Sequence, residues 1–76
     1  MEQLPQFRPG VYRHFKGNEY ELLGIARHSE TLAPMAVYRP LYGEGGLWVR
    51  PWAMWEEMVT KPEYTGPRFL FVREKP

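Results

Sequence analysis

Residues 35–51 read MAVYRPLYGEGGLWVRP, which is two strand-like runs joined by a glycine-rich turn. Apolar, aromatic and basic side chains alternate along both runs, and an alternation of period two is typical of β-strands. Gly43-Glu44-Gly45-Gly46 is short enough to be a tight hairpin loop. The stretch therefore predicts a β-hairpin. Pro40 donates no ladder hydrogen bond, so we expect an edge position or a bulge there.

Further strand-like runs lie on both sides of this hairpin, at residues 11–16, 19–28 and 68–73. Gly17-Asn18, between the first two runs, favours a two-residue turn because both residues tolerate positive φ. Gly24 offers the bend that a barrel strand needs when it passes from one sheet to the next. Together with the central hairpin, these runs predict five strands.

The expected turn at Gly17-Asn18 also sets an expected register for the first hairpin. Pairing about this turn places Lys16 opposite Glu19 and His14 near Glu21. The register matters because it decides which side chains of the two strands lie close together.

The segment between the fourth and fifth strands predicts one short helix. Pro51 suits the first position of a helix, and residues 52–58 follow with Trp52, Trp55 and Val59 on one stripe. We expect one or two helical turns packed on the barrel. Residues 60–67 contain two prolines and a glycine and are expected to form a loop.

Seventy-six residues make one domain. We expect an N-terminal arm at residues 1–9 that docks through Phe7, a single domain at residues 10–73, and a frayed tail at residues 74–76. The predicted fold is mainly β: a small SH3-like, five-stranded, partly open barrel with one short helix before the last strand. An α+β sheet with one packed helix is the main competitor, but the helix is too short to cover a whole sheet.

Composition restricts the chemistry and the partners. The chain has no cysteine, so disulfides and thiolate metal sites are excluded. Its net charge of +1 gives no strong long-range attraction to nucleic acid or acidic membranes. No apolar run reaches the roughly 18 residues of a membrane span, and the first residues lack a signal-peptide pattern. We therefore expect a cytoplasmic protein with no membrane partner.

Four ordered motifs resemble a bacterial family known as domain of unknown function 1653. They are YRHFKG at residues 12–17, LGIARHSET at residues 23–31, VYRPLYG at residues 37–43 and LWVRP at residues 47–51. The resemblance spans about Gly10 to Phe71. Because that family has no assigned activity, the resemblance implies a compact module and brings no catalytic residues or cofactor with it.

Catalytic and metal-site patterns are weak in this chain. His14, His28 and Glu30 could be imagined as metal ligands, but they lack helical or short-range ligand spacing. We interpret both histidines as making local hydrogen bonds, and we predict neither a metal nor a cofactor. Ser29 is the one serine and the chain has no aspartate, so a catalytic triad is not expected.

The remaining candidate is a surface of aromatic rings and arginines. We expect an aliphatic interior, and this assignment would force the rings outward or to the barrel mouth. The expected interior residues are Leu23, Ile25, Val37, Leu41, Val49 and Phe71. The outward face would carry Tyr12, His14, Tyr38, Tyr42, Trp48 and Arg50, with Arg27 and Arg39 at its rims. The predicted ligand-binding residues are Tyr12, Arg27, His28, Tyr38, Arg39, Tyr42, Trp48 and Arg50.

Such a surface can stack bases, hold proline rings or grip a phosphate. The leading hypothesis is a non-enzymatic binding module for a protein segment, with nucleic acid or a nucleotide as the other ligand class. A small enzyme or enzyme accessory domain that uses Arg27, His28 and Glu30 on a polar or phosphorylated substrate is an alternative, and a homodimer sealed by the aromatic face is another. The structural alternative is that the rings only close the ends of a thin barrel.

Overall fold

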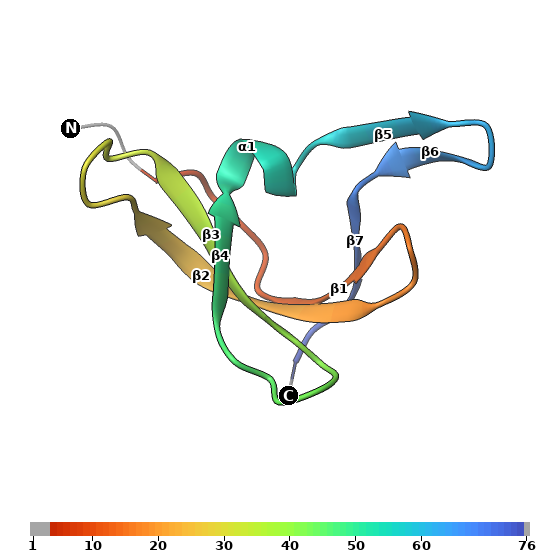
Figure 1. Ribbon diagram of the computed structural model, residues 1–76, viewed down its shortest axis with the longest axis horizontal. Coiled ribbons are helices and arrows are strands. Elements are labelled where there is room, and N and C mark those ends of the chain that lie inside the picture. The colour runs from red at the N-terminus through yellow and green to blue at the C-terminus, as the bar shows by residue number, and fades with distance from the viewer. Residues whose placement is uncertain (1–3, 76) are drawn as a thin grey trace.

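The computed structural model describes residues 4–75, and most of this part of the chain is strand (Figure 1). One sheet has five strands and a separate hairpin has two, with one short helix between them in sequence. The elements are β1 (Gly10–His14), β2 (Glu19–Arg27), β3 (Pro34–Pro40), β4 (Trp48–Pro51), α1 (Trp52–Trp55), β5 (Met58–Lys61), β6 (Tyr64–Pro67) and β7 (Phe69–Arg73).

The large sheet is antiparallel throughout, in the order β4-β3-β2-β1-β7. It curls so that β4 and β7 rise on opposite sides of a concave face with α1 above (Figure 1). In the described residues no strand pairing joins β4 to β7, so the sheet is not closed into a barrel. The prediction of a mainly β fold with five antiparallel strands in one sheet is confirmed.

The expected bend at Gly24 is present. The β2–β3 register shifts between Leu22 and Gly24, where a bulge changes the direction of β2. Pro40 ends β3 beyond its last pairing with β4, which is made by Tyr38, so the missing proline N–H leaves no gap in that ladder.

The predicted register of the first hairpin is wrong. Glu19 pairs with Arg13, not with Lys16. The His14 amide donates to the carbonyl of Asn18 at 2.8 Å, which closes a three-residue loop. The last residue of that loop is a glycine with φ of 111°, the position at which three-residue hairpin loops need positive φ.

The predicted short helix is present with a single turn, but it ends before Met58, and the predicted loop at residues 60–67 is wrong. Helix α1 ends at Trp55, and β5 begins at Met58 and pairs with β6 across a two-residue turn. Val59 and Thr60 are β-branched and favour a strand over further helix. Within residues 4–75, helix α1 is far shorter than a bilayer is thick, so no described helix can cross a membrane.

The predicted division of the sheet into an interior and an exterior face is partly wrong. Val49 is 60% exposed and Leu23 is 40% exposed, although both were expected inside. Ile25, Val37, Leu41 and Phe71 are half-buried. The buried core cluster is Tyr20, Leu22, Ala36, Tyr38, Trp55 and Phe69, with Phe7, Tyr12 and Trp52 packed against it.

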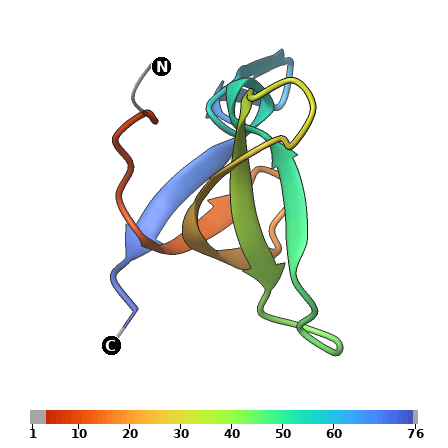
Figure 2. The ribbon, with the colours of Figure 1, turned by 90° about the vertical axis from the view of Figure 1, so that its left-hand side faces the viewer.

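The N-terminal arm docks as predicted through Phe7, which packs against the core. It approaches β1 beside β7 (Figure 2), where the Arg8 guanidinium lies 3.8 Å from the ring centroid of Phe71. Residues 1–3 of the predicted arm and Pro76 of the predicted tail lie outside the described residues.

Candidate functional site

The concave face of the sheet is lined with aromatic rings. Trp55 of α1 stacks on Phe69 of β7, with ring centroids 3.9 Å apart and planes within 4°. Tyr38 of β3 packs against Trp55 at 5.0 Å and against Tyr20 at 5.6 Å. Helix α1 thus covers one end of the concave face and leaves the other end to the residues of β4 and the loop before it.

Two of the rings expected outside are instead packed inside. Tyr38 is 3% exposed, and Tyr12 is half-buried, with its hydroxyl donating to the carbonyl of Arg8 at 2.6 Å. A domain of this size has few core positions, and a ring buries more area per residue than a valine. The curled side of the sheet therefore contains the rings, while Val37 and Val49 lie on the other face.

Tyr42 and Trp48 remain at the rim, with 45% and 48% of their surface exposed. Both pack against Tyr20, Tyr42 at 5.7 Å and Trp48 at 6.4 Å between centroids. The Tyr20 and Tyr42 hydroxyls form a hydrogen bond of 2.9 Å. Burial, followed by this hydrogen bond, raises the pKa of Tyr20 to about 12.

Arg50 lies on the concave face, two residues from Trp48 along β4. Its Nε donates to the Tyr38 hydroxyl at 3.3 Å, and its guanidinium lies 5.3 Å from the Phe69 ring centroid. None of the ion pairs between described residues involves Arg50. The Nη groups therefore have no carboxylate partner in the described part of the chain and can bind an external anion.

The other predicted arginine and histidine positions lie away from this surface. Arg39 forms an ion pair with Glu21, with an Nη–Oε1 distance of 2.8 Å. Arg27 donates to the carbonyl of Leu32 at 3.0 Å. Arg39 is therefore paired with a carboxylate and Arg27 with a backbone carbonyl, whereas the partner of Arg50 is the neutral Tyr38 hydroxyl.

His28 organises the β2–β3 loop. Its Nδ1 accepts the backbone N–H groups of Glu30 at 3.1 Å and of Thr31 at 3.3 Å. The expectation of a local hydrogen bond is confirmed for this histidine. The contact with Glu30 is made by the glutamate backbone, not by its carboxylate, so the two side chains do not form an acid–base pair. Among residues 4–75 no cluster of three or more histidines and carboxylates could hold a metal.

His14 contributes to the concave face but was not among the predicted ligand-binding residues. Its ring packs edge-on against Phe69 at 4.9 Å and lies 4.6 Å from Phe15. Burial and the nearby cations Arg50, Arg68 and Lys16 lower the pKa of His14 below its ordinary value. The alternation along the strand had placed it on the same predicted outward face as Tyr12, two residues earlier.

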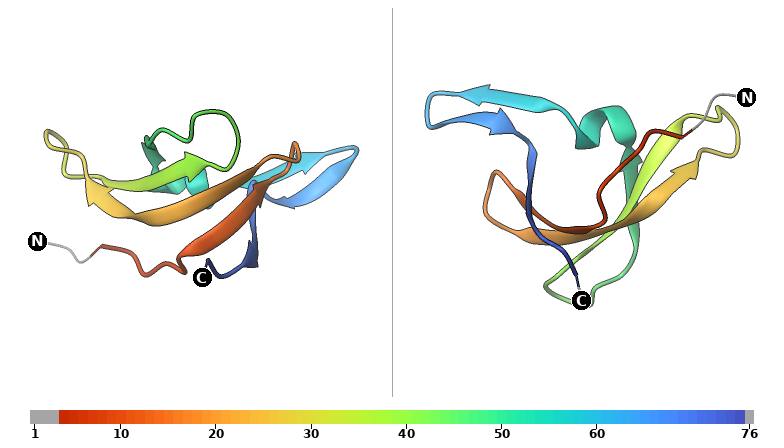
Figure 3. Two further views of the ribbon diagram at one scale, coloured as in Figure 1. Left: turned by 90° about the horizontal axis from the view of Figure 1, so that it is seen from below. Right: turned by 180° about the vertical axis from the view of Figure 1, so that it is seen from behind.

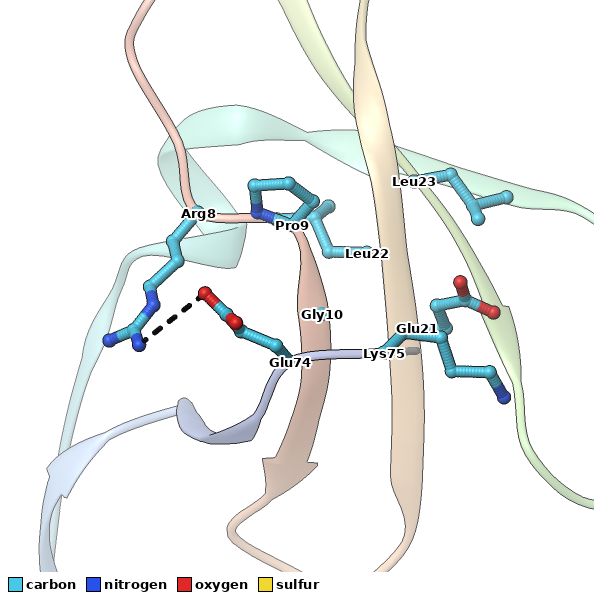
Figure 4. Close-up of a pocket in the computed structure, with 8 residues that line it drawn as sticks. All are labelled: Arg8, Pro9, Gly10, Glu21, Leu22, Leu23, Glu74 and Lys75. Atoms are coloured by element: carbon cyan, nitrogen blue, oxygen red, sulfur yellow. Dashed lines mark ion pairs between the residues drawn. The ribbon is translucent and has the colours of Figure 1, made fainter.

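An open cavity of about 280 Å³ lies at the rim, bounded by Tyr42 and Trp48 and by residues 43–46. A larger open cavity of about 350 Å³ lies between residues 8–10, residues 74–75 and β2, and Figure 4 shows its lining. That cavity contains no aromatic ring, and its Arg8 and Glu74 are a highly exposed pair 4.0 Å apart. We therefore place the candidate site at the rim.

A family model described as "Protein of unknown function (DUF1653)" matches residues 10–71. The chain belongs to the DUF1653 family. A crystal structure of another DUF1653 protein, from Bordetella bronchiseptica, is similar to this chain with 42% identity and a TM-score of 0.82, covering 92% of each chain. No curated protein matches the chain. The DUF1653 relationship thus supports the fold and assigns no activity.

Proposed function

We propose that this protein is a non-enzymatic binding module that holds a segment of a partner protein at the rim of the concave face. The rim surface is defined as Tyr42, Trp48 and Arg50. Trp48 and Tyr42 would supply exposed ring faces for a proline or aromatic side chain, and Arg50 a charge-assisted hydrogen bond. Tyr38 would act indirectly, because its hydroxyl holds the Arg50 guanidinium.

One observation carries this proposal. The half-exposed rings of Tyr42 and Trp48 bound an open cavity, and Arg50, two residues after Trp48 on β4, has no carboxylate partner in residues 4–75. The rings rest on a packed aromatic core, so little conformational entropy is lost when a ligand docks on them. A preorganised aromatic surface of this kind is what peptide-binding grooves use.

The finer architecture that we propose is an SH3-like, partly open barrel, with residues 10–73 as the unit that binds. The bulges in β1 and β2 support it, because they curl the sheet toward closure, and so does the position of α1 over the open side. The absence of cysteine supports a reducing compartment such as the cytoplasm.

Titration of the ¹⁵N-labelled protein with a proline-rich peptide, ATP and a short oligothymidylate tests the proposal. We expect the peptide to bind, and Trp48→Ala or Arg50→Gln to weaken it at least tenfold, about 1.4 kcal/mol each. Val49→Ala is the matched control, because Val49 lies between them on the opposite face.

Three results would contradict the proposal. Equal affinity in the Trp48→Ala and Val49→Ala variants would show that the rim is not the site. Preference for ATP or oligothymidylate would assign the rim to a nucleotide ligand. A tight dimer in sedimentation, dissociated by Trp48→Ala, would show that the rim is a subunit interface instead.

A further inference from the structure

The β1–β2 turn lies near the β5–β6 hairpin (Figure 3). Three cationic side chains lie close to the ring of Phe15 in this turn. The Phe15 ring stacks on Tyr64 of β6, with centroids 6.0 Å apart. Lys16 Nζ and Lys61 Nζ each lie 5.9 Å from the Phe15 ring centroid, and the Arg68 guanidinium lies 5.6 Å from it. Lys16 is far from Lys61 and Arg68 in the sequence, so the fold brings these cations together.

Carboxylates do not neutralise most of this group. Arg68 pairs with Glu57, but no ion pair in residues 4–75 involves Lys16 or Lys61. By contrast, Arg8 of the N-terminal arm and Arg13, Arg39 and Arg73 of the sheet each have a glutamate partner. The net charge of +1 therefore hides a local excess of positive charge.

His14 joins this group to Arg50. Its ring lies between Phe15 and Phe69, and the Arg50 guanidinium lies over Phe69. His14 Nδ1 accepts the backbone N–H of Lys16 at 3.2 Å, so a neutral imidazole carries its proton on Nε2. The charged groups that face His14 are all cations: Arg50 from β4, Arg68 from the segment before β7 and Lys16 from the turn.

We propose that Lys16, Lys61, His14 and Arg50 form an oxyanion subsite that holds the carboxylates of an acidic segment in the partner protein. This subsite, the basic cluster, rests on the proposed function, because it specifies the partner of the rim surface. Its side chains supply N–H donors, and an open cavity of about 190 Å³ lined by His14, Phe15 and Tyr64 lies beside it.

The separation of the two surfaces suits a short peptide. The rings of Trp48 and His14 each have their centroid 6.4 Å from that of Tyr20, on which both pack. They are therefore at most about 13 Å apart, the length of about four extended residues. A partner segment with a ring at the rim and carboxylates two to four residues away matches both surfaces.

Charge favours a peptide over a nucleic acid. A nucleic acid backbone carries a phosphate at every nucleotide and is usually bound along a basic track. Here the cations without a carboxylate partner in residues 4–75 gather around Phe15 and His14, whereas the cavity beside Tyr42 and Trp48 is lined by Glu44 and by no cation. A ring followed by an acidic cluster fits this asymmetry better than a uniform polyanion.

Binding of two matched peptides tests the inference. One has two prolines followed by four glutamates, and the other has glutamines in place of the glutamates. We expect the acidic peptide to bind at least tenfold more tightly, with an affinity that falls as salt rises. The double substitution Lys16→Gln and Lys61→Gln should remove this advantage and leave the affinity for the glutamine peptide unchanged.

Lys75→Gln is the control for overall charge, because Lys75 lines the cavity beside residues 8–10 and is not part of the basic cluster. If Trp48→Ala weakens both peptides but the double lysine variant binds the acidic peptide normally, the basic cluster is refuted and the rim stands. If neither peptide binds at millimolar concentration, the basic cluster and the rim surface are both refuted as binding sites. Tighter binding of oligothymidylate or of inorganic phosphate than of the acidic peptide would also overturn the peptide assignment.

Discussion

Leu22 and Leu23 are neighbouring residues of one type that lie on opposite faces of β2. Leu22 is 1% exposed and Leu23 is 40% exposed. Leu22→Ala should lower the free energy of unfolding by about 2–5 kcal/mol, because it leaves a cavity in the core. Leu23→Ala should lower it by less than about 1 kcal/mol. Urea denaturation of both variants measures the difference, and equal or reversed losses would contradict the face assignment.

The alternation of side chains in the sequence predicted two faces but not which face is inside. Val37 and Tyr38 belong to opposite faces of β3, and hydrophobicity alone favours valine for the interior. Which face is buried depends on the curvature of the sheet and on the size of the side chains. The rings line the concave side because a thin core needs much buried area from few residues. Bulges set that curvature, and their effect on side-chain direction is not visible in the periodicity.

His14 should make the stability of the folded protein depend on pH. Burial and three nearby cations lower its pKa in the folded protein below the ordinary 6.5. Between these two values the unfolded chain binds more protons than the native protein, so acidification favours unfolding. Stability should be fully retained above about pH 6.5 and fall as the pH drops through the folded pKa.

His14→Gln removes the titrating imidazole and should therefore reduce the loss of stability between about pH 7 and pH 5. Urea midpoints at several pH values give the comparison. His28→Gln is the matched control, because His28 lies in the β2–β3 loop and accepts only backbone N–H groups there. An identical pH profile for wild type and His14→Gln would show that His14 does not titrate differently in the folded state.

At the scale of elements, the start of β1 depends on a close approach to the end of β7. Gly10 has φ of 145°, and a Cβ there would lie 2.6 Å from the carbonyl oxygen of Arg73. Gly10→Ala should therefore destabilise the protein by at least about 2 kcal/mol, through backbone strain and displacement of β7.

Gly24→Ala is the matched control, because nothing lies within 4 Å of a Cβ at that position. It should change stability by less than about 1 kcal/mol. Thermal unfolding of both variants makes the comparison. Tolerance of alanine at Gly10 would mean that β1 and β7 do not approach this closely.

The strands of the large sheet and the Gly24 bulge follow from local patterns in the sequence, because period-two runs and glycines determine them directly. The β5–β6 hairpin was not predicted, because Pro62, Gly66 and Pro67 were interpreted as loop residues. In the structure Pro62 lies in the turn and Pro67 ends β6, both positions that tolerate proline. The predicted register of the first hairpin was wrong because the register depends on the loop length, which the dipeptide Gly17-Asn18 does not determine.

At the scale of the whole molecule, charge and rings are distributed unevenly. Arg8, Arg13, Arg39 and Arg73 are each paired with a glutamate. Arg50 lies on the concave face and Lys16 and Lys61 lie beside the Phe15 ring, all three without a carboxylate partner in residues 4–75. Trp48 and Arg50 were predicted as binding residues from sequence. The basic cluster was not predicted, because it combines the β1–β2 turn with a hairpin that the sequence did not reveal.

Amide chemical-shift mapping with the acidic peptide tests the central claim, that one concave surface binds the partner, most directly. We predict that the largest shifts fall in residues 14–16, 42–50 and 61–68, with residues 21–23 little affected. Shifts confined to residues 8–10, 21–23 and 74–75, which line the larger cavity, would contradict the claim and move the binding site to that cavity.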